Sequence, residues 1–227
     1  MERKNFLKKG LIGVGSIVAL PTVISSCTKD IADNELATDT TSENCTVSPK
    51  ETSGPYPILT PAQLVKSSII GDRSGVALLM TFTVQDQSNG CKPLSGVLVD
   101  VWHCDKDGNY SQYGKNKSDN FLRGRQTTDS NGQVSFISIF PGWYTGRAPH
   151  IHIEILDSSE KSLLVSQIAF PVATYTEVYN STGYNGAPDT SNSQDDIFAD
   201  SLDENMADYI TGNITDGYTL LKTIVVE

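Results

Sequence analysis

Histidine, tryptophan and cysteine are scarce in this chain, whose 227 residues include three, two and four of them respectively. Basic residues are also few, with 17 lysines and arginines against 27 aspartates and glutamates and a formal net charge of −10. This acidity argues against nucleic acids and anionic membrane surfaces as partners. The sequence contains no internal repeat. With 38% hydrophobic and 19% charged residues, the chain can form a globular domain with a substantial core and is not disordered overall.

No apolar run is long enough for a stable transmembrane helix. The run over residues 10–24 follows four basic residues and precedes Cys27. A basic start, a short apolar stretch and the sequence Ile-Ser-Ser-Cys predict a lipoprotein signal peptide over residues 1–26, with Cys27 as the acylated residue. The first residues also resemble a twin-arginine export signal in which Lys4 replaces the second arginine. The twin-arginine route and the general secretory route both remain open.

Cleavage after residue 26 removes four basic residues and Glu2, which leaves 13 basic against 26 acidic residues and a net charge near −13. Residues 27–48 are polar and show no periodicity, so we expect a lipidated, flexible tether. The folded domain is then expected over residues 49–227. The lipid anchor places the protein outside the inner membrane of a bacterium, facing the periplasm or the cell surface. Its only expected contact with a membrane is through the lipid, and the oligomeric state stays open.

Three cysteines remain in this oxidising compartment: Cys45, Cys91 and Cys104. One disulfide and one free thiol account for them most simply, and three pairings exist. Because Cys91 and Cys104 flank a single expected strand, the strand would hold them too far apart for a disulfide. We slightly favour the pairing of Cys45 with Cys104, although the sequence does not decide between the remaining pairings.

Short segments with β-strand character alternate with turn sequences such as Ser-Asn-Gly and Lys-Asp-Gly. This spacing predicts an all-β fold, an antiparallel β-sandwich of the immunoglobulin or transthyretin-like kind. One short helix is expected within Ile197–Ile210. The loops over residues 51–59 and 175–196 are expected to shape a substrate pocket. The expected strands are Val76–Gln85, Val97–Trp102, Gln133–Ile139, His150–Leu156, Leu163–Phe170 and Tyr218–Val226.

Two of the three histidines are one residue apart, in the expected strand His150–Leu156. Alternation along a strand puts His150 and His152 on one face, roughly 7 Å apart at Cα, and the intervening isoleucines on the other. The preceding Pro-Gly-Trp-Tyr and Thr-Gly-Arg-Ala-Pro sequences predict a turn that returns Tyr144 and Arg147 to the head of this strand. The pattern indicates a metal site with imidazole and phenol ligands. The alternatives are histidines that are merely hydrogen-bonded or solvated, and a structural zinc or copper site.

Four motifs occur in one order along the chain. Trp102 to Tyr110 reads W-x-x-x-x-x-G-x-Y, and Phe121 to Gly132 reads F-L-R-G-x-Q-x-T-D-x-x-G. P-G-x-Y then ends at Tyr144, and R-x-x-H-x-H begins at Arg147. Together the motifs resemble those of the intradiol ring-cleavage dioxygenases, ferric enzymes that split catechols between their two hydroxyl groups. Gln167, on the next expected strand, falls where this family has a glutamine near the substrate.

The resemblance implies one mononuclear non-heme Fe(III) with four protein ligands: Tyr110, Tyr144, His150 and His152. Two phenolates suit a hard trivalent ion and keep it ferric. Tyr144 matches the axial tyrosine that the substrate displaces. Arg147 and Gln167 are implied to stabilise anionic charge on the reacting ring.

The implied reaction is the cleavage, by O2, of a catecholic or hydroxyquinol-like aromatic to a cis,cis-muconate-type diacid, as in aromatic compound catabolism. The alternative is a non-catalytic lipoprotein β-sandwich that binds a catechol-bearing ligand. The short segment between Tyr144 and His150 and the export signal are more similar to the secreted branch of the family. His103 has no ligand role in the family and is interpreted either as structural or as a neighbour that supports a ligand. Arg123 and Asp129 are interpreted as supports of the site.

Each matched residue also has an ordinary interpretation. Tyr110 fits a turn tyrosine and Tyr144 a tyrosine corner of a β-sandwich. Arg147 fits a surface ion pair, and Gln167 fits a solvent-facing strand position. The combination of motifs, rather than any single residue, favours the metal site.

Overall fold

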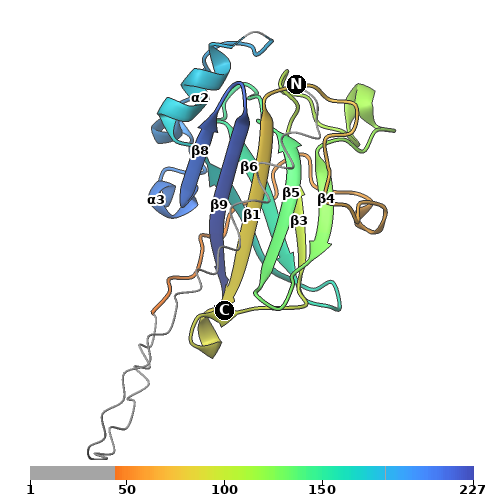
Figure 1. Cartoon of the computed structure of the whole chain (residues 1–227), viewed down its shortest axis with the longest axis vertical. Helices are drawn as coiled ribbons and strands as arrows, with labels where there is room; N and C mark the ends of the chain where they lie inside the picture. Colours follow the sequence, from red (N-terminus) through yellow and green to blue (C-terminus); the bar gives the residue numbers. More distant parts are fainter. Residues whose placement is uncertain (1–43, 182) are drawn as a thin grey trace, which may run out of the picture. The chain divides into compact units, whose positions relative to one another are not determined.

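The structure is a computed structural model, and it describes residues 44–181 and 183–227 (Figure 1). The expected signal peptide, the acylated Cys27 and most of the expected tether lie outside the described residues. The described part belongs to one unit. None of its helices is both long and apolar enough to cross a membrane.

Two β-sheets form the body of the domain (Figure 1). The first has the order β2-β1-β9-β8, and β5 pairs with β1. The second has the order β4-β3-β6-β7. Every pairing is antiparallel except that of β1 with β9, and the predicted all-β sandwich is confirmed. The strands are β1 (Ala77–Asp86), β2 (Lys92–Pro93), β3 (Leu98–Trp102), β4 (Arg123–Thr127), β5 (Gln133–Ile139), β6 (His150–Leu156), β7 (Ser162–Ala169), β8 (Tyr209–Asn213) and β9 (Gly217–Val226).

Alternating burial along the strands separates a core face from a second face. In β6, Ile151, Ile153 and Ile155 are fully buried in the main hydrophobic cluster, together with residues of the first sheet. His150 and His152 alternate with them, as the sequence predicted, and therefore point to the opposite face of the second sheet. The candidate site lies on this face.

The predicted helix within Ile197–Ile210 is present but covers only part of that range. Only α3 (Leu202–Asn205) is helical within Ile197–Ile210, because β8 already begins at Tyr209. The longer helix, α2 (Val172–Tyr179), overlaps the start of the expected loop 175–196. Its sequence is rich in β-branched and aromatic residues, so packing of Tyr175, Val178 and Tyr179 into the core must stabilise it rather than propensity. Short 3-10 helices cover Pro61–Gln63, Gln87–Asn89, Gly114–Asn116 and Asn192–Gln194.

The favoured disulfide was also wrong, because Cys45 is bonded to Cys91. The chain beside Cys45 runs along the end of β9, where Ser48 exchanges hydrogen bonds with Val225. Cys91 follows the end of β1, which is in parallel register with the end of β9. Cys104 instead follows the far end of β3 and is the buried free cysteine of the described chain. The direction of β3 therefore excludes the predicted pairing.

Candidate metal centre

The two histidines of β6 face each other. His150 Nε2 lies 3.2 Å from His152 Nε2. His152 is in register with Trp102 of β3 and Gln167 of β7, so it sits in the middle of the sheet. The Trp102 and His152 rings stack with centroids 4.9 Å apart and an interplanar angle of 1°, which fixes the plane of the imidazole.

Burial favours the neutral form of both imidazoles, and His150 presents the lone pair of its Nε2 to the site. His150 Nδ1 donates to the carbonyl of Ala148 at 2.6 Å, so Nε2 of the neutral ring carries no hydrogen. Burial lowers the pKa of His150 to about 3 and that of His152 well below its usual range. Two buried rings whose Nε2 atoms approach this closely suit coordination of a cation.

Two phenols complete the group. Tyr144 Oη lies 3.5 Å from His150 Nε2. The Tyr110 ring is 5.8 Å from the Tyr144 ring and 6.3 Å from the His152 ring, centroid to centroid. The Tyr110 hydroxyl is buried and has no hydrogen-bond partner among the described residues. Burial raises the pKa of Tyr110 well above its usual range and also raises that of Tyr144, so both phenols stay protonated until a cation binds.

This donor set fits a ferric ion. The described residues contain no cluster of three or more His, Cys, Asp or Glu side chains that could hold a metal. A metal at this site therefore needs the phenols as well as the imidazoles, and such a mixed set favours a hard trivalent ion over zinc. The unpartnered Tyr110 hydroxyl is the observation that supports this fit, because a buried hydroxyl without a partner is costly unless a ligand satisfies it.

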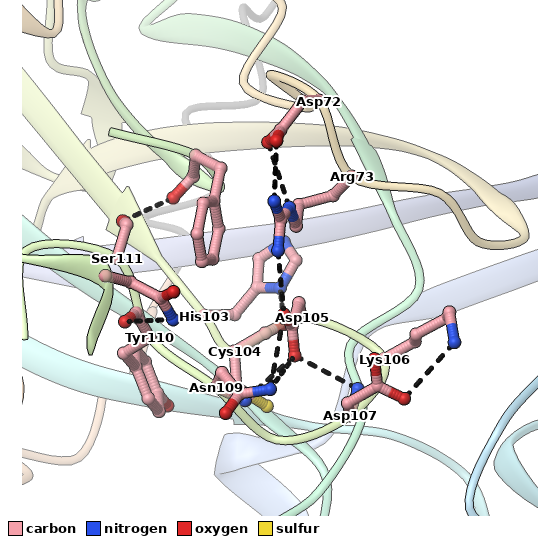
Figure 2. A network of polar contacts seen from close by, with 12 residues as sticks. Asp72, Arg73, His103, Cys104, Asp105, Lys106, Asp107, Asn109, Tyr110 and Ser111 are labelled. Atoms are coloured by element: carbon pink, nitrogen blue, oxygen red, sulfur yellow. Dashed lines mark hydrogen bonds and ion pairs between the residues drawn. The ribbon is translucent and has the colours of Figure 1, made fainter. Parts of the chain in front are cut away.

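The loop that carries Tyr110 is fixed by Asp105. Figure 2 shows the contacts of this carboxylate. Oδ1 accepts hydrogen bonds from the backbone N–H groups of Asp107 and Asn109, and Oδ2 forms an ion pair with Arg73. The Asp105 carbonyl also accepts from Gly142 N, in the loop that carries Tyr144. The two tyrosine-bearing loops are thus bound to each other through their backbones.

Aromatic and cationic groups wall the site on the Tyr110 side. Tyr56 stacks on Tyr110 with centroids 4.7 Å apart. Arg123 is fully buried, donates to the carbonyls of Ser111 and Tyr56, and lies 5.7 Å from the Tyr110 ring centroid. The segment containing Gly54 passes so close that a Cβ there would lie 3.0 Å from His152 Cε1. The loop 51–59 therefore contacts the site, and its part in shaping a substrate pocket stays a prediction. The role of Tyr56 was missed, although its place in the turn Gly-Pro-Tyr-Pro was a usable signal.

Arg147 and Gln167 lie together at the other side of the site. Arg147 Nη2 donates to Gln167 Oε1 at 2.6 Å, and Gln167 Nε2 donates to the Thr52 carbonyl. Gln167 is 1% exposed, so the solvent-facing interpretation of this residue is wrong. Arg147 is not a surface ion pair either, because its partner Asp195 is fully buried. Sequence reasoning missed Asp195, since one aspartate in a long polar loop carries no distinguishing signal.

The remaining candidates lie outside the donor group. His103 donates from Nδ1 to the Cys104 carbonyl and accepts at Nε2 from Ser138 Oγ, which confirms its structural interpretation. Arg123 supports the site as expected. Asp129 accepts from the backbone N–H groups of Asn131 and Gln133, so it stabilises its own turn between β4 and β5.

The sequence model of the family described as Dioxygenase matches residues 57–180, more than half of the chain. Chlorocatechol 1,2-dioxygenase of Rhodococcus opacus is 31% identical over 126 residues, which cover 47% of this chain and 48% of that protein. The protocatechuate 3,4-dioxygenase beta chain of Burkholderia cepacia is 32% identical over 127 residues, which cover 49% of this chain and 53% of that protein. The chain thus spans about half the length of these curated relatives.

A solved structure covers more of the chain. An intradiol ring-cleavage dioxygenase from Tetranychus urticae has a TM-score of 0.74 at 30% sequence identity. The match covers 81% of this chain and 95% of that one. The dioxygenase domain of a carbohydrate-binding fusion protein from Streptomyces sp. SirexAA-E has a TM-score of 0.61 at 26% identity, over 80% of this chain and 99% of that one.

Proposed function

Because this chain belongs to the intradiol ring-cleavage dioxygenase family, we propose that it uses O2 and one ferric ion to cleave a catecholic or hydroxyquinol-like aromatic. The ring opens between the two hydroxyl-bearing carbons and yields a cis,cis-muconate-type diacid. The observation that supports this most directly is the convergence of two phenols and two imidazoles from β6 and two loops, with the Tyr110 hydroxyl buried and unpartnered among the described residues.

The proposed iron ligands are Tyr110, Tyr144, His150 and His152. When bound, the ferric ion makes a chelated catechol reactive toward O2. The chain's own groups prepare this chemistry. The Ala148 carbonyl orients His150, and Trp102 orients His152. Tyr110, His150 and His152 are buried, whereas Tyr144 is half-buried.

Arg147 and Gln167 are the proposed catalytic side chains. Arg147 lies beside Tyr144 and carries a positive charge. This charge lowers the pKa of Tyr144, whereas burial raises the same pKa by a larger amount. A catechol dianion bound beside Tyr144 would have its oxygens next to this guanidinium, which could stabilise their negative charge. Gln167 holds the Arg147 Nη2 group and is itself held by the Thr52 carbonyl, so the pair is preorganised.

The test is O2 consumption by the iron-loaded domain with catechol, a substituted catechol and hydroxyquinol. We expect one O2 consumed per diacid formed, and both atoms of 18O2 in the diacid. His152→Ala should abolish the reaction because it removes one of the four proposed ligands. If the wild-type protein binds catechols but consumes no O2 with any of them, the non-catalytic binding module replaces this proposal.

We also propose that Cys27 is acylated and anchors the domain outside the inner membrane. The support is the basic, apolar and Ile-Ser-Ser-Cys pattern of the first 27 residues. Full-length protein should fractionate with membranes and take up labelled palmitate, and Cys27→Ala should release it. A Cys27→Ala protein that stays membrane-bound contradicts the anchor.

A further inference from the structure

Asp195 is a fully buried carboxylate outside the proposed ligand set, and it satisfies four hydrogen bonds. Both of its oxygens accept from Arg147 Nε, at 2.8 and 3.0 Å. Oδ2 also accepts from the backbone of Ala148 at 2.7 Å, and Oδ1 from that of Ile197 at 3.0 Å. A buried carboxylate with this many donors is fixed in one orientation, and it fixes the positions of the groups that donate to it.

The contacts of Asp195 lead to the site along two routes. Through Arg147, it fixes Nε while Gln167 fixes Nη2 at 2.6 Å. Through Ala148, it holds the backbone N–H of the residue whose own carbonyl accepts from His150 Nδ1. Asp195 thus makes no hydrogen bond to a proposed ligand. It instead contacts two residues beside the ligands, Arg147 and Ala148.

We propose that Asp195 is a positioning residue that aims the Arg147 guanidinium at the catechol-binding side of Tyr144. The proposal builds on the proposed function. An arginine side chain has several rotatable bonds, so a fixed guanidinium direction requires partners on more than one nitrogen. Asp195 supplies the partner of Nε, and Gln167 supplies that of Nη2. The Phe198 ring, 5.7 Å from the guanidinium carbon, limits movement on a further side.

A double-mutant cycle tests this role: Asp195→Asn, Arg147→Met and the double variant, each loaded with iron. Asparagine keeps the size of aspartate and one acceptor oxygen for the backbone. We expect Asp195→Asn to lower kcat/KM for catechol by about 10- to 100-fold, the range found for groups that orient active-site residues. In the Arg147→Met background the same change should lower kcat/KM several-fold less than in the wild type, because the route through Arg147 is gone and only the backbone contact with Ala148 remains.

Asp189→Asn is the matched control. Asp189 lies on the same loop as Asp195 and accepts a hydrogen bond from the backbone N–H of Gly146, the residue before Arg147. Unlike Asp195, it is exposed and makes no ion pair with Arg147. We expect its kcat/KM to stay within about 2-fold of the wild-type value. Urea unfolding of each variant establishes that the domain is folded, and Asp195→Glu replaces Asp195→Asn in the cycle if the latter does not fold.

An equal loss of kcat/KM in the wild-type and Arg147→Met backgrounds would mean that Asp195 only stabilises the loop, and no loss in either would mean that it has no role. Both results overturn the positioning proposal while the wild-type enzyme remains active. A wild-type protein without catechol turnover overturns the proposed function first, and this proposal with it. The two failures are therefore distinguishable.

Discussion

Two buried side chains, His103 and Tyr110, differ in whether the protein provides hydrogen-bond partners for their polar atoms. His103 has a hydrogen-bond partner on each ring nitrogen, whereas the Tyr110 hydroxyl has none among the described residues. The first pattern is typical of a structural residue and the second of a group that awaits a ligand. This contrast leads to separate predictions for the two residues.

Replacing Tyr110 with phenylalanine should lower the bound iron per chain several-fold, because one of four donors is lost. It should not destabilise the metal-free domain, since removal of an unsatisfied buried hydroxyl is neutral or stabilises by about 1 kcal/mol. Iron analysis and urea unfolding measure the two effects.

Tyr179→Phe is the control for Tyr110→Phe. It removes a buried hydroxyl that donates to the Pro141 carbonyl at 3.0 Å. We expect a loss of about 1 kcal/mol of unfolding free energy with unchanged iron content. A Tyr110→Phe protein that binds iron as well as the wild type would remove Tyr110 from the ligand set.

His103 should make the metal-free domain less stable in acid. Burial lowers its pKa from 6.5 to about 4. Between these pH values His103 is protonated in the unfolded chain but not in the folded chain. The contribution of neutral His103 to the free energy of unfolding is therefore complete above pH 6.5 and is lost as the pH falls to about 4. At 1.36 kcal/mol per pKa unit the loss is roughly 3 kcal/mol.

Unfolding free energies of the wild type and His103→Gln from pH 7 to pH 4 check this linkage. The wild-type curve should fall more steeply than that of the variant, while the other buried histidines affect both proteins alike. Parallel curves would show that His103 does not remain neutral in the folded domain.

At the scale of elements, the contact between the two tyrosine-bearing loops depends on Gly108. Its φ is +84°, and a Cβ there would lie 2.5 Å from the Trp143 carbonyl oxygen. Gly146 has the same φ but no atom within 4 Å of its Cβ position. Both glycines thus have a left-handed backbone conformation, but only Gly108 also lies too close to another loop to accept a Cβ atom.

Gly146→Ala should cost about 1–2 kcal/mol of unfolding free energy, the penalty for a left-handed alanine. Gly108→Ala should cost roughly 1–3 kcal/mol more, because the loops must separate to accept the methyl group. That separation moves Tyr110 away from Tyr144, so iron content should fall in Gly108→Ala only. Equal effects of the two substitutions would contradict the role of the loop contact.

Elements with alternating apolar residues were predictable, and elements defined by tertiary contacts were not. The alternation in Gln133–Ile139 and His150–Leu156 gave β5 and β6 with their observed bounds. Strand β4 was missed because its Arg123 and Arg125 are charged, and their burial depends on partners distant in sequence. The same reason applies in the site: motif spacing identified the four proposed ligands, whereas Asp195 meets Arg147 across 48 positions.

At the scale of the whole molecule, the disulfide between Cys45 and Cys91 ties the start of the described chain to the end of β1. The two residues are 46 positions apart. In the chain-entropy model, a closed loop of this length contributes about 4 kcal/mol to the free energy of unfolding.

We expect the double variant Cys45→Ser, Cys91→Ser to unfold at a lower urea concentration by an amount that reflects this loss, with its iron content preserved. Peptide mapping of the non-reduced wild type should recover the linked Cys45 and Cys91 peptides. Recovery of Cys104 in a disulfide would contradict the fold of this region, because Cys104 is buried beside Trp102 and Tyr110.

The ligand set and its reaction with a catechol are tested most directly by the visible absorption spectrum of the iron-loaded domain, recorded before and after catechol is added without O2. Coordination by Tyr110 and Tyr144 predicts a red-brown tyrosinate-to-iron band, and displacement of Tyr144 by the catechol predicts that this band shifts. A protein that stays colourless after loading with ferric iron would contradict the proposed metal centre.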